Sequence, residues 1–267
     1  MVRRIKIKSK EKRKHIVFFD IDGTLATGKI VPDSARRALE ILRGNKDPVF
    51  ICTGRNINYV RNNFNEFADG FITNNGRLAY YDDELIFDAP IDRETMSIIV
   101  DRLNKVQAGY VFHTRSHGYY NGPDDLFDLL SENNDDGYLY KGFDDKDDVF
   151  YNFDICFYDF DHYEQIKRGL EDLCIFNPHG KHHSADVTIK GTDKGDALMA
   201  VADKLNVEIS DTYAFGDGMN DICMMKAAGH GIAMGNGQDL CKQAAEYITS
   251  GIDEDGVYNG LRHYRLI

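Results

Sequence analysis

The stretch HIVFFDIDGT, residues 15–24, joins a short apolar run to two closely spaced carboxylates. The run His15 to Phe19 predicts a strand of a parallel sheet, because such strands are buried on both faces. Asp20 and Asp22 then lie at its carboxyl end, where open α/β sheets bind their ligands. The two carboxylates could supply a nucleophile or metal ligand and a proton-transfer group, while Gly23 allows a tight turn. Read alone, the Asp-Gly pair is also compatible with an ordinary turn after a strand.

Three further segments place polar residues at the ends of predicted elements. VFICTGR, residues 49–55, predicts a second strand that ends at Thr53 and Gly54. Lys194 opens a predicted helix, and FGDGMND, residues 215–221, predicts another strand that runs into an acidic loop. Because strand ends and helix starts meet at one edge of a parallel sheet, we expect the four segments to converge.

Together, the four segments resemble the motifs of the haloacid dehalogenase superfamily, which are Asp-x-Asp-Gly-Thr, a strand-terminal Thr or Ser, a Lys, and Gly-Asp-x-x-x-Asp. Asn75-Gly76 and the segments 186–195 and 252–257 are similar to the Cof-type branch of sugar-phosphate phosphatases. The resemblance extends from His15 onward and is weak within the inserted segment. It implies an α/β fold with a doubly wound, Rossmann-like parallel sheet as the core and an inserted α+β cap domain.

The order of the predicted elements divides the chain into a core, residues 1–81 and 188–267, and a cap, residues 82–187. Within the cap, strands are expected at 110–114, 153–158 and 186–189. Charge differs between the two units, since residues 82–187 contain 24 acidic and 9 basic side chains and the remainder contains 20 and 23. Such an asymmetry favours two units with different surfaces.

The resemblance also implies roles for the four aspartates. Asp20 is the nucleophile that forms an aspartyl-phosphate and binds a metal ion, and Asp22 is the general acid and base, whose backbone carbonyl also binds the metal. Asp217 completes the metal ligands, and Asp221 orients either a metal-bound water or Lys194. Four carboxylates cannot all remain ionised close together without a cation, and oxygen ligands without His or Cys favour Mg²⁺.

The resemblance also implies that the remaining site residues bind the phosphate group. Lys194 neutralises charge that builds up during attack, as a compact cation can. Lys190 precedes a similar glycine and is a rival, but Lys194 is favoured because it opens the helix. The residues expected to bind the other phosphate oxygens are Ile21 and Gly54 through their amides, Thr53 through its hydroxyl, and Asn220.

Substrate choice is expected to lie in the cap, because the core binds only phosphate. Carboxylates and aromatic residues suit a hydroxyl-rich monophosphate and suit a second phosphate poorly. The expected activity is therefore Mg²⁺-dependent hydrolysis of small phosphorylated metabolites, above all sugar phosphates. A phosphohexomutase of the same fold and a non-catalytic, phosphosugar-responsive regulator are the alternatives. The candidate cap contacts are His113, Arg115, His117, Tyr119, Tyr120, His182 and His183.

Composition limits partners and location. The net charge of −12 argues against a general binder of nucleic acid or anionic membranes. Residues 1–14 form a basic leader, which is expected to be a solvated flexible terminus and lacks the apolar stretch of a signal peptide. Five scattered cysteines without CxxC spacing suggest reduced packing residues and a cytoplasmic protein. A monomer or weak homo-oligomer is expected.

Overall fold

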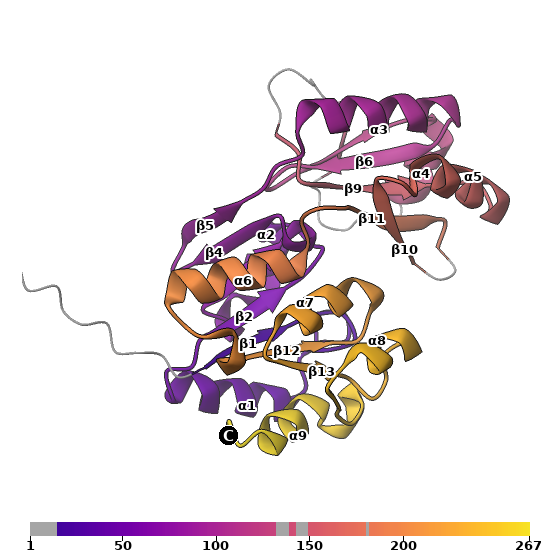
Figure 1. Ribbon diagram of the computed structural model, residues 1–267. Coiled ribbons are helices and arrows are strands. Elements are labelled where there is room, and N and C mark those ends of the chain that lie inside the picture. Colours follow the sequence, from indigo (N-terminus) through magenta and orange to yellow (C-terminus); the bar gives the residue numbers. More distant parts are fainter. Residues whose placement is uncertain (1–14, 132–138, 143–148, 180–181) are drawn as a thin grey trace, which may run out of the picture.

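The protein, described by a computed structural model over residues 15–131, 139–142, 149–179 and 182–267, contains two sheets (Figure 1). The larger sheet has the strand order β14-β13-β12-β1-β2-β3-β4-β5, and the smaller one has the order β10-β11-β9-β6-β7-β8. Helices cover the larger sheet, and the smaller sheet lies beside it with its own helices. This arrangement confirms the predicted doubly wound core with an inserted α+β cap. The basic leader lies outside the described residues.

Six strands of the core sheet are parallel. They are β1 (Ile16–Phe19), β2 (Val49–Cys52), β3 (Gly70–Thr73), β12 (Thr212–Gly216), β13 (His230–Ala233) and β14 (Tyr247–Ile248). From β1 the chain first adds β2 and β3 on one side and later adds β12 to β14 on the other. The strand order therefore reverses between β1 and β12, which is the point where such sheets bind ligands.

Helices lie on both faces of the core sheet. Val17 and Phe19 of β1 belong to one fully buried cluster, and Ile16 and Phe18 belong to another on the opposite face. Burial on both faces explains why the strand is apolar throughout. The first face carries α1 (Asp33–Gly44), α2 (Ile57–Phe64) and α9 (Gly256–His263), and the second carries α6 (Lys194–Leu205), α7 (Ile222–Ala227) and α8 (Asp239–Ala244). The 3-10 turns are η1 (Asn65–Phe67), η2 (Asn74–Gly76), η3 (Ile209–Asp211), η4 (Met219–Asp221) and η5 (Ile252–Glu254).

Two helices of the cap pack on one face of its sheet, and a third packs on the other face through Leu126. Residues of α3 (Arg93–Lys105) and α5 (Phe160–Leu170) share a buried cluster with alternate residues of the strands, among them Phe112, Phe153 and Val187. The strands are β6 (Gly109–His113), β7 (Gly118–Asn121), β8 (Leu139–Lys141), β9 (Asn152–Cys156), β10 (Cys174–Pro178) and β11 (Ser184–Ile189), and α4 (Asp124–Ser131) follows β7. Three of these strands, β7, β8 and β10, were not anticipated, because their short sequences lack a clear apolar alternation.

The boundary expected at residue 82 falls inside a hairpin of the core sheet. β4 (Leu78–Tyr81) pairs with β3, and β5 (Glu84–Asp88) pairs with β4, both antiparallel. Asp82 and Asp83 both have positive φ, 48° and 63°, as a tight two-residue hairpin turn requires. Since that turn returns the chain along β4, β5 stays in the core sheet, and the cap strand β11 runs on to Ile189, beyond the expected boundary at 187.

None of the described helices has both the length and the apolar character that crossing a membrane requires.

Candidate active site

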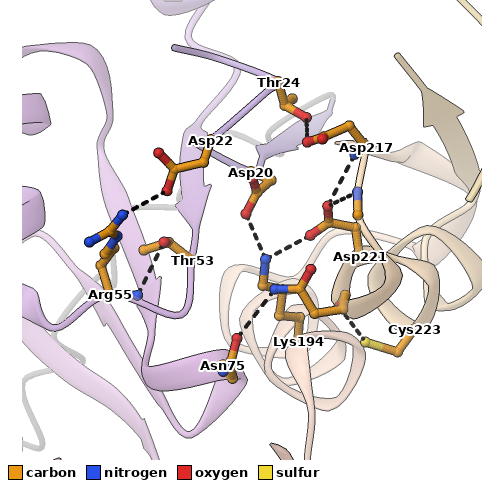
Figure 2. A network of polar contacts seen from close by, with 12 residues as sticks. Asp20, Asp22, Thr24, Thr53, Arg55, Asn75, Lys194, Asp217, Asp221 and Cys223 are labelled. Atoms are coloured by element: carbon orange, nitrogen blue, oxygen red, sulfur yellow. Dashed lines mark hydrogen bonds and ion pairs between the residues drawn. The ribbon is translucent and has the colours of Figure 1, made fainter. Parts of the chain in front are cut away.

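A buried lysine joins two of the predicted aspartates (Figure 2). The Nζ atom of Lys194 lies 2.7 Å from Oδ1 of Asp20, which follows β1. A second contact of 2.7 Å links the same Nζ to Oδ1 of Asp221, in the turn after β12. The side chain of Lys194 is 1% exposed, so the ammonium group is withdrawn from solvent and held between two carboxylates. Three distant parts of the sequence thus meet at one point.

The start of α6 explains where this lysine lies. Asp193 caps the helix, and its Oδ1 accepts hydrogen bonds from the backbone N–H of Gly195 and of Asp196 at 2.7 and 3.2 Å. Gly76, with φ of +90°, packs against this cap so closely that a Cβ there would lie 2.2 Å from backbone atoms of Asp193. The turn after β3 therefore fixes the position of the helix end that carries Lys194.

The rival lysine lies elsewhere. Lys190 donates through Nζ to the carbonyl of Glu171 at 2.7 Å, on the exposed surface of the cap. Of the two candidates, the structure brings Lys194 into the aspartate cluster.

Asp217 is positioned by the first motif. The hydroxyl of Thr24 donates to Oδ1 of Asp217 at 2.9 Å. Gly23 has φ of +88°, and an added Cβ would lie 2.5 Å from Oδ2 of Asp217, so this position requires glycine. Asp221 is held in turn by the backbone N–H groups of Asp217 and Gly218, which donate to its Oδ2 at 3.1 and 2.9 Å.

These three carboxylates form a site suited to a cation. Asp20, Asp217 and Asp221 each offer an oxygen atom, and those atoms lie within 4.8 Å of one another. Burial and the charge of Asp221 raise the pKa of Asp20 well above its ordinary value, although Lys194 opposes this rise. Burial, again with Asp221, raises the pKa of Asp217 to about 6. One lysine therefore does not compensate the cluster fully, and an all-oxygen set of this kind fits Mg²⁺.

The side chain of Asp22 points away from this cluster. Its Oδ2 lies 3.5 Å from Nη2 of Arg55, and both side chains are about half exposed. The guanidinium group of Arg55 also lies over the ring of Tyr59, 4.8 Å from its centroid. The backbone N–H of Arg55 donates to the hydroxyl of Thr53 at 3.2 Å. Asp22 thus faces the rim of the site, on the side of the second motif.

Of the other residues predicted to bind phosphate, Ile21 lies in the first loop, and the rest lie around the turn after β3. Asn220 donates through Nδ2 to Oδ1 of Asn75 at 3.4 Å, and a Cβ on Gly54 would lie 3.0 Å from that oxygen. Ile21 is buried, and its carbonyl accepts from the backbone N–H of Ala26 at 2.8 Å, which closes the first loop. Gly54, Asn75 and Asn220 are therefore neighbours.

Three contacting residues were absent from the predicted site: Thr24, Arg55 and Asn75. Thr24 ends the first motif, Arg55 follows the second, and Asn75 belongs to the Asn75-Gly76 pair that is similar to the Cof-type branch, so each had a sequence signal. Their roles depend on which partner the fold brings to them, which one sequence does not reveal.

The residues predicted to contact the substrate from the cap lie in different environments. Tyr120 is buried, and Tyr119 packs against Tyr140 and Phe150. Arg115 is held by Asp88 at 2.6 Å and by the hydroxyl of Tyr151 at 2.9 Å. His117 contacts Ser116 at 2.8 Å, His182 and His183 are exposed, and His113 contacts Asp154 at 2.8 Å.

Comparison with known proteins agrees with the fold and the motifs. A family model described as haloacid dehalogenase-like hydrolase matches residues 17–261. The 5-amino-6-(5-phospho-D-ribitylamino)uracil phosphatase YcsE of Bacillus subtilis is 29% identical over 94% of this chain and 96% of that protein. A phosphoglycolate phosphatase of Halobacterium salinarum is 29% identical over 89% of this chain and 91% of that protein. The solved structure of the HAD subclass IIB sugar phosphatase BT4131 is 26% identical, covers 95% of this chain and 100% of its own, and superposes with a TM-score of 0.80.

The fold and the four converging motifs define a hydrolase with a Rossmann-like core and a cap. The chain belongs to the haloacid dehalogenase-like hydrolase family.

Proposed function

We propose that this protein is a Mg²⁺-dependent phosphomonoester hydrolase that acts on small phosphorylated metabolites, above all sugar phosphates, through an aspartyl-phosphate intermediate. One observation carries the proposal. The buried carboxylate of Asp20 lies at the carboxyl end of β1 with a lysine 2.7 Å away and two further carboxylates beside it. A carboxylate is a competent phosphoryl acceptor where neighbouring cations offset the charge of the incoming ester.

In the first half-reaction, an oxygen of Asp20 attacks phosphorus and the bond to the ester oxygen breaks. Asp22 gives its proton to the departing alkoxide, a step that can contribute roughly 10² to 10⁴ in rate. Its exposed position at the rim, beside Arg55, supports this role, because an exposed side chain is accessible to a leaving group.

In the second half-reaction, water attacks the aspartyl-phosphate and gives a proton to Asp22. The bond between phosphorus and Asp20 then breaks, which releases inorganic phosphate and restores the carboxylate. Lys194, held by Asp221 at 2.7 Å, offsets negative charge on the transferred group throughout. Thr53, Asn220 and the amides of Ile21 and Gly54 are proposed to hold its non-bridging oxygens.

The proposed Mg²⁺ ligands are the carboxylates of Asp20 and Asp217 and the backbone carbonyl of Asp22. When bound there, Mg²⁺ supplies positive charge that lets an anionic nucleophile approach an anionic ester. Asp221 is proposed to orient Lys194, in agreement with their contact.

We propose residues 89–190 as the cap, because β5 belongs to the core sheet and β11 ends at Ile189. The named relatives act on a ribitylaminouracil phosphate, phosphoglycolate and a sugar phosphate, so one core serves different leaving groups. The five cysteines are all unpaired, which supports a cytoplasmic location. A monomer or weak homo-oligomer remains our expectation, and light scattering tests it.

The test measures phosphate release by the full chain from a panel of phosphorylated sugars, nucleotides and cofactors, with Mg²⁺ and with EDTA. We expect turnover that requires Mg²⁺ and that Asp20→Asn abolishes without loss of the folded state. Asp203→Asn, on the exposed surface of α6, is the matched control and should retain full activity.

The alternatives give different results. A phosphohexomutase would interconvert isomeric sugar phosphates with little net phosphate release. A non-catalytic regulator would bind sugar phosphates without turnover. Normal activity in Asp20→Asn would exclude the proposed nucleophile.

A further inference from the structure

Two His–Asp pairs lie on the cap sheet. Nε2 of His113 on β6 is 2.8 Å from Oδ2 of Asp154 on β9. Nε2 of His179, just after β10, is 2.9 Å from Oδ1 of Asp186 on β11. We call these four residues the cap cluster.

The cap cluster lies on the sheet face opposite α3 and α5, part of which α4 covers through Leu126. Asp154 and Asp186 are direct partners in the antiparallel pairing of β9 and β11, so their side chains lie side by side. Neighbouring residues along these strands, Phe153 and Val187, point into the buried cluster beneath the helices. Because successive side chains alternate between faces, both carboxylates point to the opposite side.

This face of the cap is tied to the second motif of the core. Asn152, the register partner of His113, accepts a hydrogen bond from Nδ2 of Asn74 at 2.9 Å. The same Asn74 donates through its backbone N–H to the carbonyl of Arg55 at 3.1 Å. Two hydrogen bonds through Asn74 therefore connect β9, which carries Asp154, to Arg55, the residue that pairs with Asp22.

Electrostatics agree with this proximity. Burial disfavours the charged form of Asp186, but the hydrogen bond and charge of His179, together with the charge of Arg55, hold its pKa below the ordinary value. Burial likewise opposes charge on His113, Asp154 raises its pKa overall, and Arg55 acts against that rise. The charge of the guanidinium group that pairs with Asp22 therefore acts on one member of each His–Asp pair.

The two carboxylates remain partly accessible to a ligand. Side-chain exposure is 24% for Asp154 and 29% for Asp186. An ionised carboxylate accepts about four hydrogen bonds and donates none. Both ring nitrogens of His179 are already occupied, since Nδ1 contacts the hydroxyl of Ser184 at 2.9 Å and Nε2 contacts Asp186. Within the described part of the cap, the hydrogen-bonding capacity that the cap cluster keeps for a ligand therefore consists of the lone pairs of its two carboxylates.

We propose that the cap cluster receives the leaving group of the substrate and selects leaving groups that are rich in hydroxyl or amino donors and carry no second anion. A polyol or sugar donates to Asp154 and Asp186. A leaving group that ends in carboxylate or phosphate brings only acceptors and like charge to the same oxygens. This inference rests on the proposed function, because it concerns the part of the ester that departs beside Asp22.

The first test uses the wild-type chain with Mg²⁺ and compares kcat/KM for sorbitol 6-phosphate, phosphoglycolate and 4-nitrophenyl phosphate. We expect the polyol phosphate to exceed phosphoglycolate by at least about tenfold, the effect of one well-made hydrogen bond to a charged group. An equal or higher value for phosphoglycolate would overturn the inference.

The second test uses Asp154→Asn and Asp186→Asn, which keep the shape of each side chain and remove its charge. We expect the preference for sorbitol 6-phosphate over phosphoglycolate to fall at least about tenfold in each variant, mainly through KM. Asp161→Asn is the matched control, because Asp161 is an exposed residue of α5, which packs on the sheet face opposite the cap cluster. The substrate preference of this variant should match that of the wild type.

The outcomes separate the two proposals. Absence of turnover of all three esters by the wild type would contradict the proposed phosphatase function itself. Turnover with proportional losses on all three esters in both variants would contradict only the role of the cap cluster. If a variant does not fold, inhibition of the wild type by free alcohols provides the test. Sorbitol should inhibit hydrolysis of 4-nitrophenyl phosphate more strongly than glycolate does. The reverse order would contradict the inference.

Discussion

Gly23 links backbone geometry to the carboxylate cluster. Its left-handed φ of +88° and the 2.5 Å approach of a Cβ to Oδ2 of Asp217 both exclude a side chain. We expect Gly23→Ala to displace Asp217 and reduce kcat/KM by about 10² or more, since a displacement of about 1 Å in an active site can have that effect. Steady-state kinetics over a range of Mg²⁺ concentrations measure it.

Gly28 provides the control for this prediction. It also has a positive φ, 62°, but an added Cβ would meet no atom within 4 Å. Gly28→Ala should therefore lose about 1–2 kcal/mol of stability through backbone strain and keep its Mg²⁺ dependence. Equal activity losses in both variants would show that strain, and not contact with Asp217, is responsible.

The rate loss on substitution of Asp22 should be larger for esters with a poorer leaving group. A phenolate departs with less help from an acid than an alkoxide does. We therefore expect Asp22→Asn to slow hydrolysis of alkyl phosphates by roughly 10² or more and that of 4-nitrophenyl phosphate less. The comparison of kcat/KM for the two ester types measures this, and equal losses would contradict the acid role.

At the scale of elements, the pair of His113 and Asp154 joins β6 to β9 and should make stability depend on pH. The pKa of His113 is raised in the folded protein by Asp154 against the effect of burial. A raised pKa means that the stabilisation is fully present below the unfolded value of about 6.5 and is lost as pH rises through the folded pKa. His113→Gln should therefore reduce the free energy of unfolding more at pH 5.5 than at pH 8.5.

Denaturant unfolding at the two pH values measures this difference. The loss near pH 5.5 should be about 1.5–3 kcal/mol, the usual contribution of a hydrogen bond to a charged group. His182→Gln is the control, because His182 is exposed and its change should be small at both pH values. A loss for His113→Gln that does not vary with pH would show that packing alone is responsible.

At the scale of the whole molecule, Mg²⁺ should stabilise the fold. A ligand that binds only the native state adds about 2.7 kcal/mol at one hundred times its Kd, which raises Tm by several degrees in a chain of this size. Asp217→Asn should remove most of this rise. In EDTA the same variant should be at least as stable as wild type, because burial and Asp221 raise the pKa of Asp217 to about 6 and so disfavour its charged form.

Thermal unfolding with Mg²⁺ and with EDTA measures both effects, the rise in Tm that Mg²⁺ causes and the stability of the variant without metal. Asp203→Asn should behave as wild type in both conditions. A Tm rise in Asp217→Asn equal to that of wild type would remove Asp217 from the proposed metal ligands.

Much of the core could be predicted from local patterns. The apolar runs before Asp20 and Asp217 are continuous because both faces of the parallel sheet are buried, and the sequence shows this directly. The cap was harder, because β7, β8 and β10 are short and their pairing depends on strands far along the chain. The boundary expected at residue 82 divided a hairpin whose two strands both belong to the core sheet.

By itself, the sequence determined the class of fold, the identity of the motif residues and the order in which they follow their strands and helix. Only the tertiary structure decided which of Lys190 and Lys194 meets the aspartates, that Asp22 faces Arg55, and that His–Asp pairs of the cap lie beside that arginine. The physical reason is that propensity and periodicity act within a few residues, whereas these contacts join side chains that are brought together only when the sheets and helices pack.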